Sequence, residues 1–198
     1  MNDPKTIFQL RWQDYGTPIA AGTEEVAADQ DVDDVTGYAG TTETDNTITL
    51  TAIAARMESP RNLIVTWTAG GGMTGGYCRA YGIGVTGRPI NELFTCGTGT
   101  TTCTGSKAFV TVDRVSIWGV TGTITGDDLI KIGVGTKVGL IMGDDEELVD
   151  IVKERSNFVD LLVVTTDARI NRTYRTFIPT ALGADLEIWY TTKKTITW

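Results

Sequence analysis

The chain has 198 residues, of which 41% are hydrophobic, and this length is enough for one sizeable folded core. It contains no histidine, so a Ser-His or Cys-His nucleophile pair and the commonest metal ligand are both excluded. The net charge of −8 and the isoelectric point near 4.5 argue against a nucleic-acid partner, because phosphate binding requires a concentrated basic face.

Residues 1–46 form the first predicted unit, an extended acidic arm or loop. The first fifty residues contain ten acidic side chains against Lys5 and Arg11, so they carry the whole net charge. Between residues 23 and 45 most side chains are small or acidic, and they offer little apolar surface to offset the entropy of ordering. Two interpretations stay open: an arm that becomes ordered against a partner subunit, or a solvated loop that keeps the protein soluble.

Residues 47–198 form the second predicted unit, a β-sandwich domain. Seven Thr-Gly dipeptides, six of them between Thr74 and Gly126, predict short strands joined by tight turns. Alternating apolar and polar residues predict strands over residues 47–54, 62–68, 77–86, 90–96, 107–120, 130–140 and 186–196. A hairpin is expected between the third and fourth of these, and a bulge midway through the fifth. The fold class is therefore mainly β, either a β-sandwich or a jelly roll.

Residues 144–155 are the segment for which a helix is predicted. Acidic residues come first and basic residues last, which complements a helix dipole. Leu148, Ile151 and Val152 would also share one helical face. Residues 149–164 could instead form two β-segments joined at 155–157. We favour the helix, so the expected fold is mainly β with at most one or two short helices.

The sequence GIGVTG at residues 82–87 matches the GxGxxG pattern of dinucleotide-binding sites. Such a site needs a helix directly after the glycines, because the helix N-terminus holds the pyrophosphate. Here Arg88, Pro89 and another predicted strand follow instead. A hairpin is therefore the preferred interpretation, and no cofactor is expected.

Two acidic clusters raise the question of a metal site. Asp29, Asp31 and Asp33 imitate the start of a calcium loop, but Asp34 stands where such a loop requires glycine. Weak calcium capture there, or by residues 144–146, is left open, and a solvated acidic face is the preferred interpretation. No pair of acids is singled out by its spacing, so no catalytic residue and no metal ligand is predicted.

The three cysteines are too few for a disulfide scaffold. Cys96 and Cys103 flank a short loop that a disulfide could close, leaving Cys78 unpaired. The alternative is two thiols, which a reducing cytoplasm favours.

A succession of strand and turn motifs gives the chain a family resemblance. The motifs are PRNLIVTWTAG (60–70), GVTGRPINELF (84–94), GSKAFVTVDRVSIWGV (105–120), IGVGTKVGL (132–140) and YRTFIPTALGADLEIWYTT (174–192). In this order they resemble a group of tailed-bacteriophage virion proteins, over roughly residues 47–192. The resemblance implies a β-rich structural component of the particle, such as a head decoration or cement protein, and brings no catalytic residues.

The expected function is thus non-enzymatic and structural, at a virion that is assembled in the host cytoplasm. Its expected partners are the major capsid protein or other virion proteins and further copies of the chain, with no membrane and no nucleic acid. Trp12 and Trp198 are candidate interface anchors, because large aromatic side chains near chain ends can fill a partner's pocket. The alternatives are a tail, neck or fibre subunit, a carbohydrate-binding sandwich that uses Trp12 or Tyr81, and a glycan hydrolase.

Overall fold

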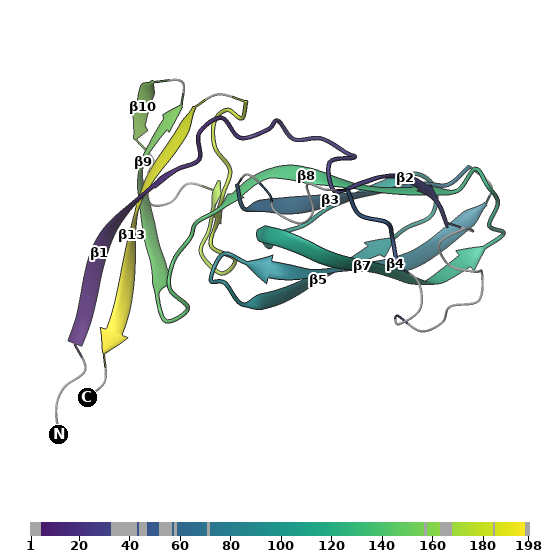
Figure 1. The fold of residues 1–198 in the computed structure, drawn as a ribbon, viewed down its shortest axis with the longest axis horizontal. Coiled ribbons are helices and arrows are strands. Elements are labelled where there is room, and N and C mark those ends of the chain that lie inside the picture. The colour runs from purple at the N-terminus through teal and green to yellow at the C-terminus, as the bar shows by residue number, and fades with distance from the viewer. Residues whose placement is uncertain are drawn as a thin grey trace.

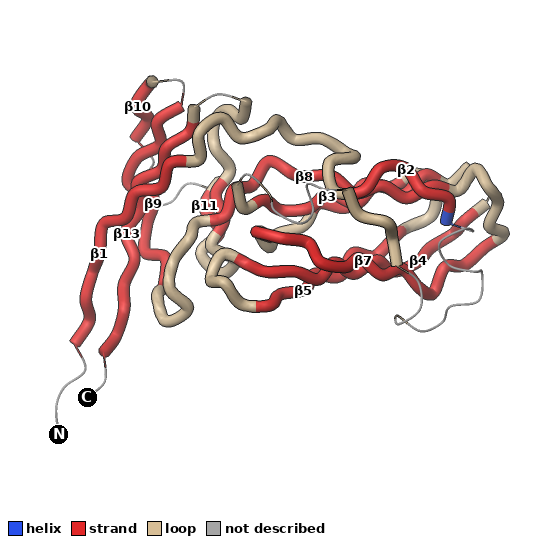
Figure 2. Tube along the Cα trace, in the orientation of Figure 1, coloured by secondary structure: helices blue, strands red, loops and turns tan. Residues whose placement is uncertain are grey.

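The structure is a computed structural model, and it describes residues 5–32, 43, 47–51, 57, 59–70, 72–156, 158–162, 168–183 and 185–196. All thirteen elements named within these ranges are β-strands (Figure 2). They form two sheets, a nine-stranded one that makes the body and a four-stranded one beside it (Figure 1). The prediction of a mainly β, sandwich-like fold is confirmed.

The strands and their pairing are as follows. In chain order they are β1 (Lys5–Asp14), β2 (Ala27–Asp31), β3 (Arg61–Thr68), β4 (Met73–Gly84), β5 (Pro89–Cys96), β6 (Thr101–Thr104), β7 (Phe109–Gly122), β8 (Leu129–Gly139), β9 (Glu147–Ser156), β10 (Val159–Leu162), β11 (Ile170–Asn171), β12 (Thr176–Phe177) and β13 (Leu186–Ile196). The smaller sheet has the order β1-β13-β9-β10. The larger has the order β11-β12-β8-β3-β7-β4-β5, with β2 paired to β8 and β6 paired to β3.

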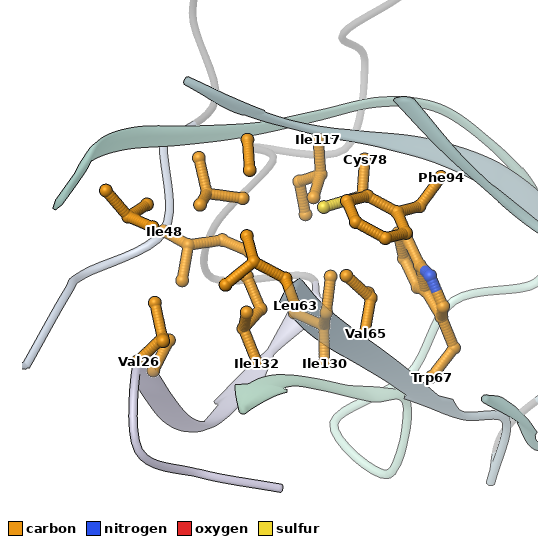
Figure 3. Packing of buried hydrophobic residues seen from close by; sticks show 14 of the residues in the cluster. Val26, Ile48, Leu63, Val65, Trp67, Cys78, Phe94, Ile117, Ile130 and Ile132 are labelled. Atoms are coloured by element: carbon orange, nitrogen blue, oxygen red, sulfur yellow. The ribbon is translucent and has the colours of Figure 1, made fainter. Parts of the chain in front are cut away.

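The larger sheet curls so that two groups of its strands face each other across the main core. One layer contains β2, β8, β3 and β6, the other contains β7, β4 and β5, and the pair Arg61 and Phe109 joins β3 to β7. Leu63, Val65 and Trp67 alternate along β3 and point from the first layer toward residues of the second (Figure 3). The sandwich is therefore held by side chains from both layers.

The smaller sheet has a hydrophobic core of its own. Ile151 of β9 and Ile188 and Tyr190 of β13 pack against Leu140 and Met142, which follow β8. β1 and β13 pair over the whole length of β1 and project from the body as a ribbon, with β9 paired to β13 as far as Lys193 (Figure 1). The region after residue 46 is thus more than a sandwich, because it also supplies β9, β10 and β13 of the second sheet.

The predicted helix over 144–155 is wrong, because residues 147–156 form strand β9. Within it the buried residues Leu148, Ile151 and Glu154 are spaced by three, and Ser156 at its end is also buried. This spacing arises because the register against β13 shifts twice, leaving Val149 and Val152 as extra residues. Two bulges in one strand therefore imitate the apolar spacing of a helix.

The described part of segment 1–46 is not a separate arm. Residues 5–14 pair with β13 over their whole length, and residues 27–31 pair with β8 of the sandwich. Val26 and Val32, at the two ends of β2, are fully buried in the main core. This corrects the predicted boundary at residue 46, since the N-terminal segment contributes a strand to each sheet. Residues 33–42 and 44–46 lie outside the described residues.

The predicted strand over 47–54 is replaced by a crossing segment. Thr47 makes an isolated bridge to Ser116, and residues 48–51 belong to no strand. The N–H of Ile48 donates to Val115 in one layer, and the N–H of Thr51 donates to Val26 beside the other layer, each at 2.9 Å. Alternation along this segment thus reflects contact with both layers. Residues 52–56 lie outside the described residues.

The GxGxxG segment is a hairpin, as predicted. β4 and β5 pair antiparallel, and the N–H groups of Gly84 and Gly87 close the turn at 2.9 Å. Gly87 has φ +76°, which favours glycine, and a Cβ on Gly82 would lie 1.9 Å from the carbonyl oxygen of Thr111. These glycines serve strand packing and the turn. The bulge expected in β7 is also present, where the register against β4 shifts at Asp113.

The disulfide considered between Cys96 and Cys103 does not form in this structure. Cys103 is a free thiol whose Sγ donates to the carbonyl oxygen of Thr95 at 3.2 Å. Burial raises the pKa of this thiol, which makes it less reactive. Of the two sequence interpretations the structure therefore has the thiol at Cys103, and the side chain of Cys96 lies outside the described residues.

Candidate interaction surface

Three large apolar side chains stand in a row on one face of β1. Residues at i, i+2 and i+4 of a strand point to the same side, and here they are Phe8, Leu10 and Trp12. Their exposed fractions are 66%, 66% and 57%. We call Phe8, Leu10, Trp12 and the neighbouring Trp189 of β13 the ribbon face. A contiguous exposed apolar row of this kind is typical of an interaction site.

On the opposite side of β1, Arg11 and Gln13 contact the protein, while Ile7 and Gln9 are exposed. Arg11 forms an ion pair with Glu146, whose side chain is buried. Gln13 accepts a hydrogen bond from the N–H of Ile141 at 2.9 Å, and the Tyr190 hydroxyl donates to the Ile141 carbonyl oxygen at 2.5 Å. Burial raises the pKa of Tyr190 to about 12, so this hydroxyl keeps its proton. At this end of β1 the usual arrangement is therefore inverted, since the polar Arg11 and Gln13 pack against the protein while the apolar Leu10 and Trp12 meet solvent.

Trp12 is held in place by its neighbours on β13. Its ring lies 6.4 Å from that of Trp189, and its indole N–H donates to Glu187 at 3.3 Å. The Lys153 ammonium lies 3.9 Å from the centre of the Trp189 ring. Arg155 binds both Glu187 and Asp160. These contacts fix the aromatic pair before any partner arrives, which lowers the entropy lost on binding.

The ion pair between Arg11 and Glu146 ties β1 to the body, and we expect it to weaken in acid. Burial raises the pKa of Glu146, but the N–H of Gly143 and the Arg11 guanidinium lower it more, so the pKa lies below its ordinary value of 4.5. An acid with a lowered folded pKa stabilises the fold above its unfolded pKa, and this contribution is lost as the pH falls through the folded pKa.

Glu146→Gln should therefore cost about 1 kcal/mol at neutral pH and flatten the loss of stability below about pH 5. Urea denaturation at a series of pH values measures both effects. Glu147→Gln is the matched control, because Glu147 is an exposed partner of Lys193. If Glu146→Gln lost stability below about pH 5 as steeply as the wild type does, the Arg11–Glu146 ion pair would not be the cause of that loss.

The other predicted sites lie elsewhere. Tyr81 is partly covered, with the Arg114 guanidinium 4.2 Å from its ring centre, so it offers less of a stacking platform than Trp12 does. Trp198 lies outside the described residues. Asp144, Asp145 and Glu146 each bind a different basic side chain, namely Arg88, Lys194 and Arg11. Among the described residues, no group of three metal-ligating side chains comes together.

Comparison with known proteins found no matching family model, no similar curated protein and no similar solved structure. In the part of the chain that the structure describes, no helix is long and apolar enough to cross a membrane.

Sequence reasoning singled out Trp12 but missed Phe8 and Leu10. The signal was present, because FQLRWQ at residues 8–13 alternates apolar residues with glutamine and arginine, as a strand does. It was overlooked because the segment was grouped with the acidic residues that follow it. Alternation alone would also have predicted that the apolar side is buried, which the structure reverses.

Proposed function

We propose that this protein is a non-enzymatic structural component of a bacteriophage particle, specifically a capsid decoration (cement) protein that binds and stabilises the head shell. The ribbon face is its contact surface, and the partner is the major capsid protein or another virion protein. The observation that carries the proposal is the exposed row Phe8, Leu10 and Trp12 on a ribbon that projects from a rigid sandwich (Figure 1).

The geometry suits a subunit that clamps a shell. Aromatic side chains held in advance by neighbours are the residues that most often dominate binding energy at protein interfaces. A cement protein binds at many equivalent positions, so each contact can be weak while the whole shell gains stability. The resemblance to phage virion proteins over residues 47–192 supports the same assignment.

Trp12→Ala should weaken binding to the shell by about tenfold or more, because it removes the more exposed of the two tryptophans of the ribbon face. Co-sedimentation of the purified protein with expanded and with immature capsids measures this, and selective binding to expanded shells is expected. Phe158→Ala is the matched control, since Phe158 is 78% exposed on the turn between β9 and β10. Equal binding by the wild type and Trp12→Ala would show that the ribbon face is not the surface that contacts the shell.

Mass spectrometry of purified particles tests the class of function itself. A decoration protein should be present at a copy number near that of the capsid protein. A few dozen copies or fewer would identify the alternative, a tail, neck or fibre subunit. Complete absence from the particle would overturn the proposal.

A second candidate is a carbohydrate-binding module that stacks a sugar on Trp12. The observation in its favour is the exposed indole beside the polar groups of Glu187 and Lys153, which could orient hydroxyls. Binding to a glycan array that disappears in Trp12→Ala, without binding to capsids, would select it.

A further inference from the structure

Among the described residues, β1 is an edge strand of the smaller sheet, and it lacks the short length, the proline and the bulge that often protect an edge. It has ten residues, contains neither proline nor glycine, and pairs with β13 without a register shift. The other edge strands of the described sheets are short, as β10, β6 and β11 are, or contain a register shift, as β2 does, or begin at a proline, as β5 does. A long, regular, apolar edge offers a row of unpaired backbone groups to another strand.

We infer that β1 of one copy pairs antiparallel with β1 of a second copy, about a two-fold axis at Leu10. A two-fold axis normal to the sheet keeps both apolar rows on the same side. In this register Leu10 lies opposite Leu10 of the second copy, and Phe8 lies opposite Trp12 of the second copy. Gln9 lies opposite Arg11 on the other side. Directly opposite aromatic and aliphatic side chains stabilise a strand pair.

The neighbouring registers fit less well. A shift in one direction places Arg11 opposite Arg11 of the second copy, where like charges repel. A shift in the other direction places Gln9 opposite itself and Trp12 opposite Thr6, which loses the aromatic pair. Residues 8–12 of β1 are nearly symmetric in type about Leu10, and this symmetry favours the register with Leu10 at the axis.

The pairing also extends the aromatic row across the sheet. Trp12 lies beside Trp189 in the present register of β1 and β13, so Trp189, Trp12 and Phe8 of the second copy would form one line. Lys153 covers Trp189 at one end. Lys193 pairs with Phe8 across β1 and β13, so Lys193 of the second copy stands at the other end. Two such lines, related by the axis, flank the central leucines.

The inference deepens the proposed function, on which it rests for the use of the ribbon as a contact surface. The two sheets would join into one of eight strands, with both ribbon faces on the same side. A dimer would then present twice the apolar area to the shell, and its two sites would bind together. Pairing would also satisfy the outward backbone groups of β1.

Charge reversal at the axis tests the pairing. In Leu10→Lys two ammonium groups would face each other, and in Leu10→Glu two carboxylates would, so each variant alone should sediment as a monomer. An equal mixture should recover the dimer, because opposite charges then meet. Phe158→Lys is the control and should dimerise like the wild type. Analytical ultracentrifugation of the full chain gives the masses.

Cross-linking fixes the register. Leu10→Cys should give a covalent dimer under mild oxidation, and Phe8→Cys mixed with Trp12→Cys should give a mixed dimer. Gln9→Cys should not self-link, because its partner would be Arg11. The wild type, with its own cysteines, sets the background.

A monomeric wild-type protein, a dimer unchanged by Leu10→Lys, or linking at Gln9 in preference to Leu10 would overturn the inference. Its failure is separable from that of the proposed function. A monomer that still co-sediments with capsids would overturn only the pairing, whereas a dimer absent from particles would overturn only the function.

Discussion

Replacing Trp67 with alanine is expected to lower the free energy of unfolding by about 3–5 kcal/mol, the usual cost of removing a large core aromatic side chain. Trp67 is fully buried on β3 and pairs in register with Ile130 of β8. Its ring reaches across the sandwich toward β4, where it would lie 3.6 Å from a Cβ on Gly76 (Figure 3). Alanine would leave a cavity between the two layers. The strands cannot move to close it, because backbone hydrogen bonds hold each layer in place.

Urea denaturation followed by far-ultraviolet circular dichroism measures this loss. The control is Trp118→Ala, because Trp118 lies half-buried on β7, stacked at 5.7 Å on Tyr77. Its replacement should cost about 1 kcal/mol, since the stacking is lost but no internal cavity forms. Equal losses in the two variants would mean that the space between the layers is not the main core.

Arg61→Ala is expected to lower the free energy of unfolding by about 2–4 kcal/mol, because it leaves buried carbonyl groups without donors. Arg61 is 1% exposed at the position where β3 joins the two layers. Its guanidinium donates to the carbonyl oxygen of Gly135 at 2.9 Å and to that of Ile19 at 2.7 Å. Burial lowers the pKa of Arg61 to about 10, against a smaller opposite effect of Glu25, and the group stays charged at neutral pH.

Arg61→Lys should recover only part of this loss, since a single ammonium cannot match the planar guanidinium that reaches both carbonyls. Arg88→Ala is the surface control. Arg88 is largely exposed and pairs with Asp144 at 2.6 Å, so its loss should cost less than about 1 kcal/mol. A denaturation midpoint of Arg61→Ala close to that of Arg88→Ala would show that the hydrogen bonds of the buried arginine to Gly135 and Ile19 do not stabilise the fold. Chemical denaturation of all three variants under one condition makes the comparison.

The sequence predicts a strand well where apolar and polar residues alternate along it without interruption. β3, β8 and β13 were expected within a residue or two of their observed ends, because their apolar residues alternate without interruption. β9 was misread for a physical reason. Its bulges at Val149 and Val152 exist only because β13 lies beside it, so no local pattern could distinguish them from a helical period.

The candidate surface was predictable in part. Trp12 was identified from its type and its position near the chain end, but its role depends on which side of β1 is packed. That is decided by Glu146 and Ile141, more than one hundred residues away, which bind Arg11 and Gln13. Local sequence cannot contain this information, so the exposed position of Phe8 and Leu10 emerges only from the fold.

We propose that β1 is the assembly surface of the molecule. Hydrogen exchange of the backbone amides in Lys5–Asp14 can be compared between the dilute protein and the assembled protein, whether dimeric or bound to shells. Exchange in β1 should slow strongly on assembly, while exchange in β5, an edge strand of the sandwich, should be unchanged. Equal exchange of β1 in both states would show that β1 is not the assembly surface.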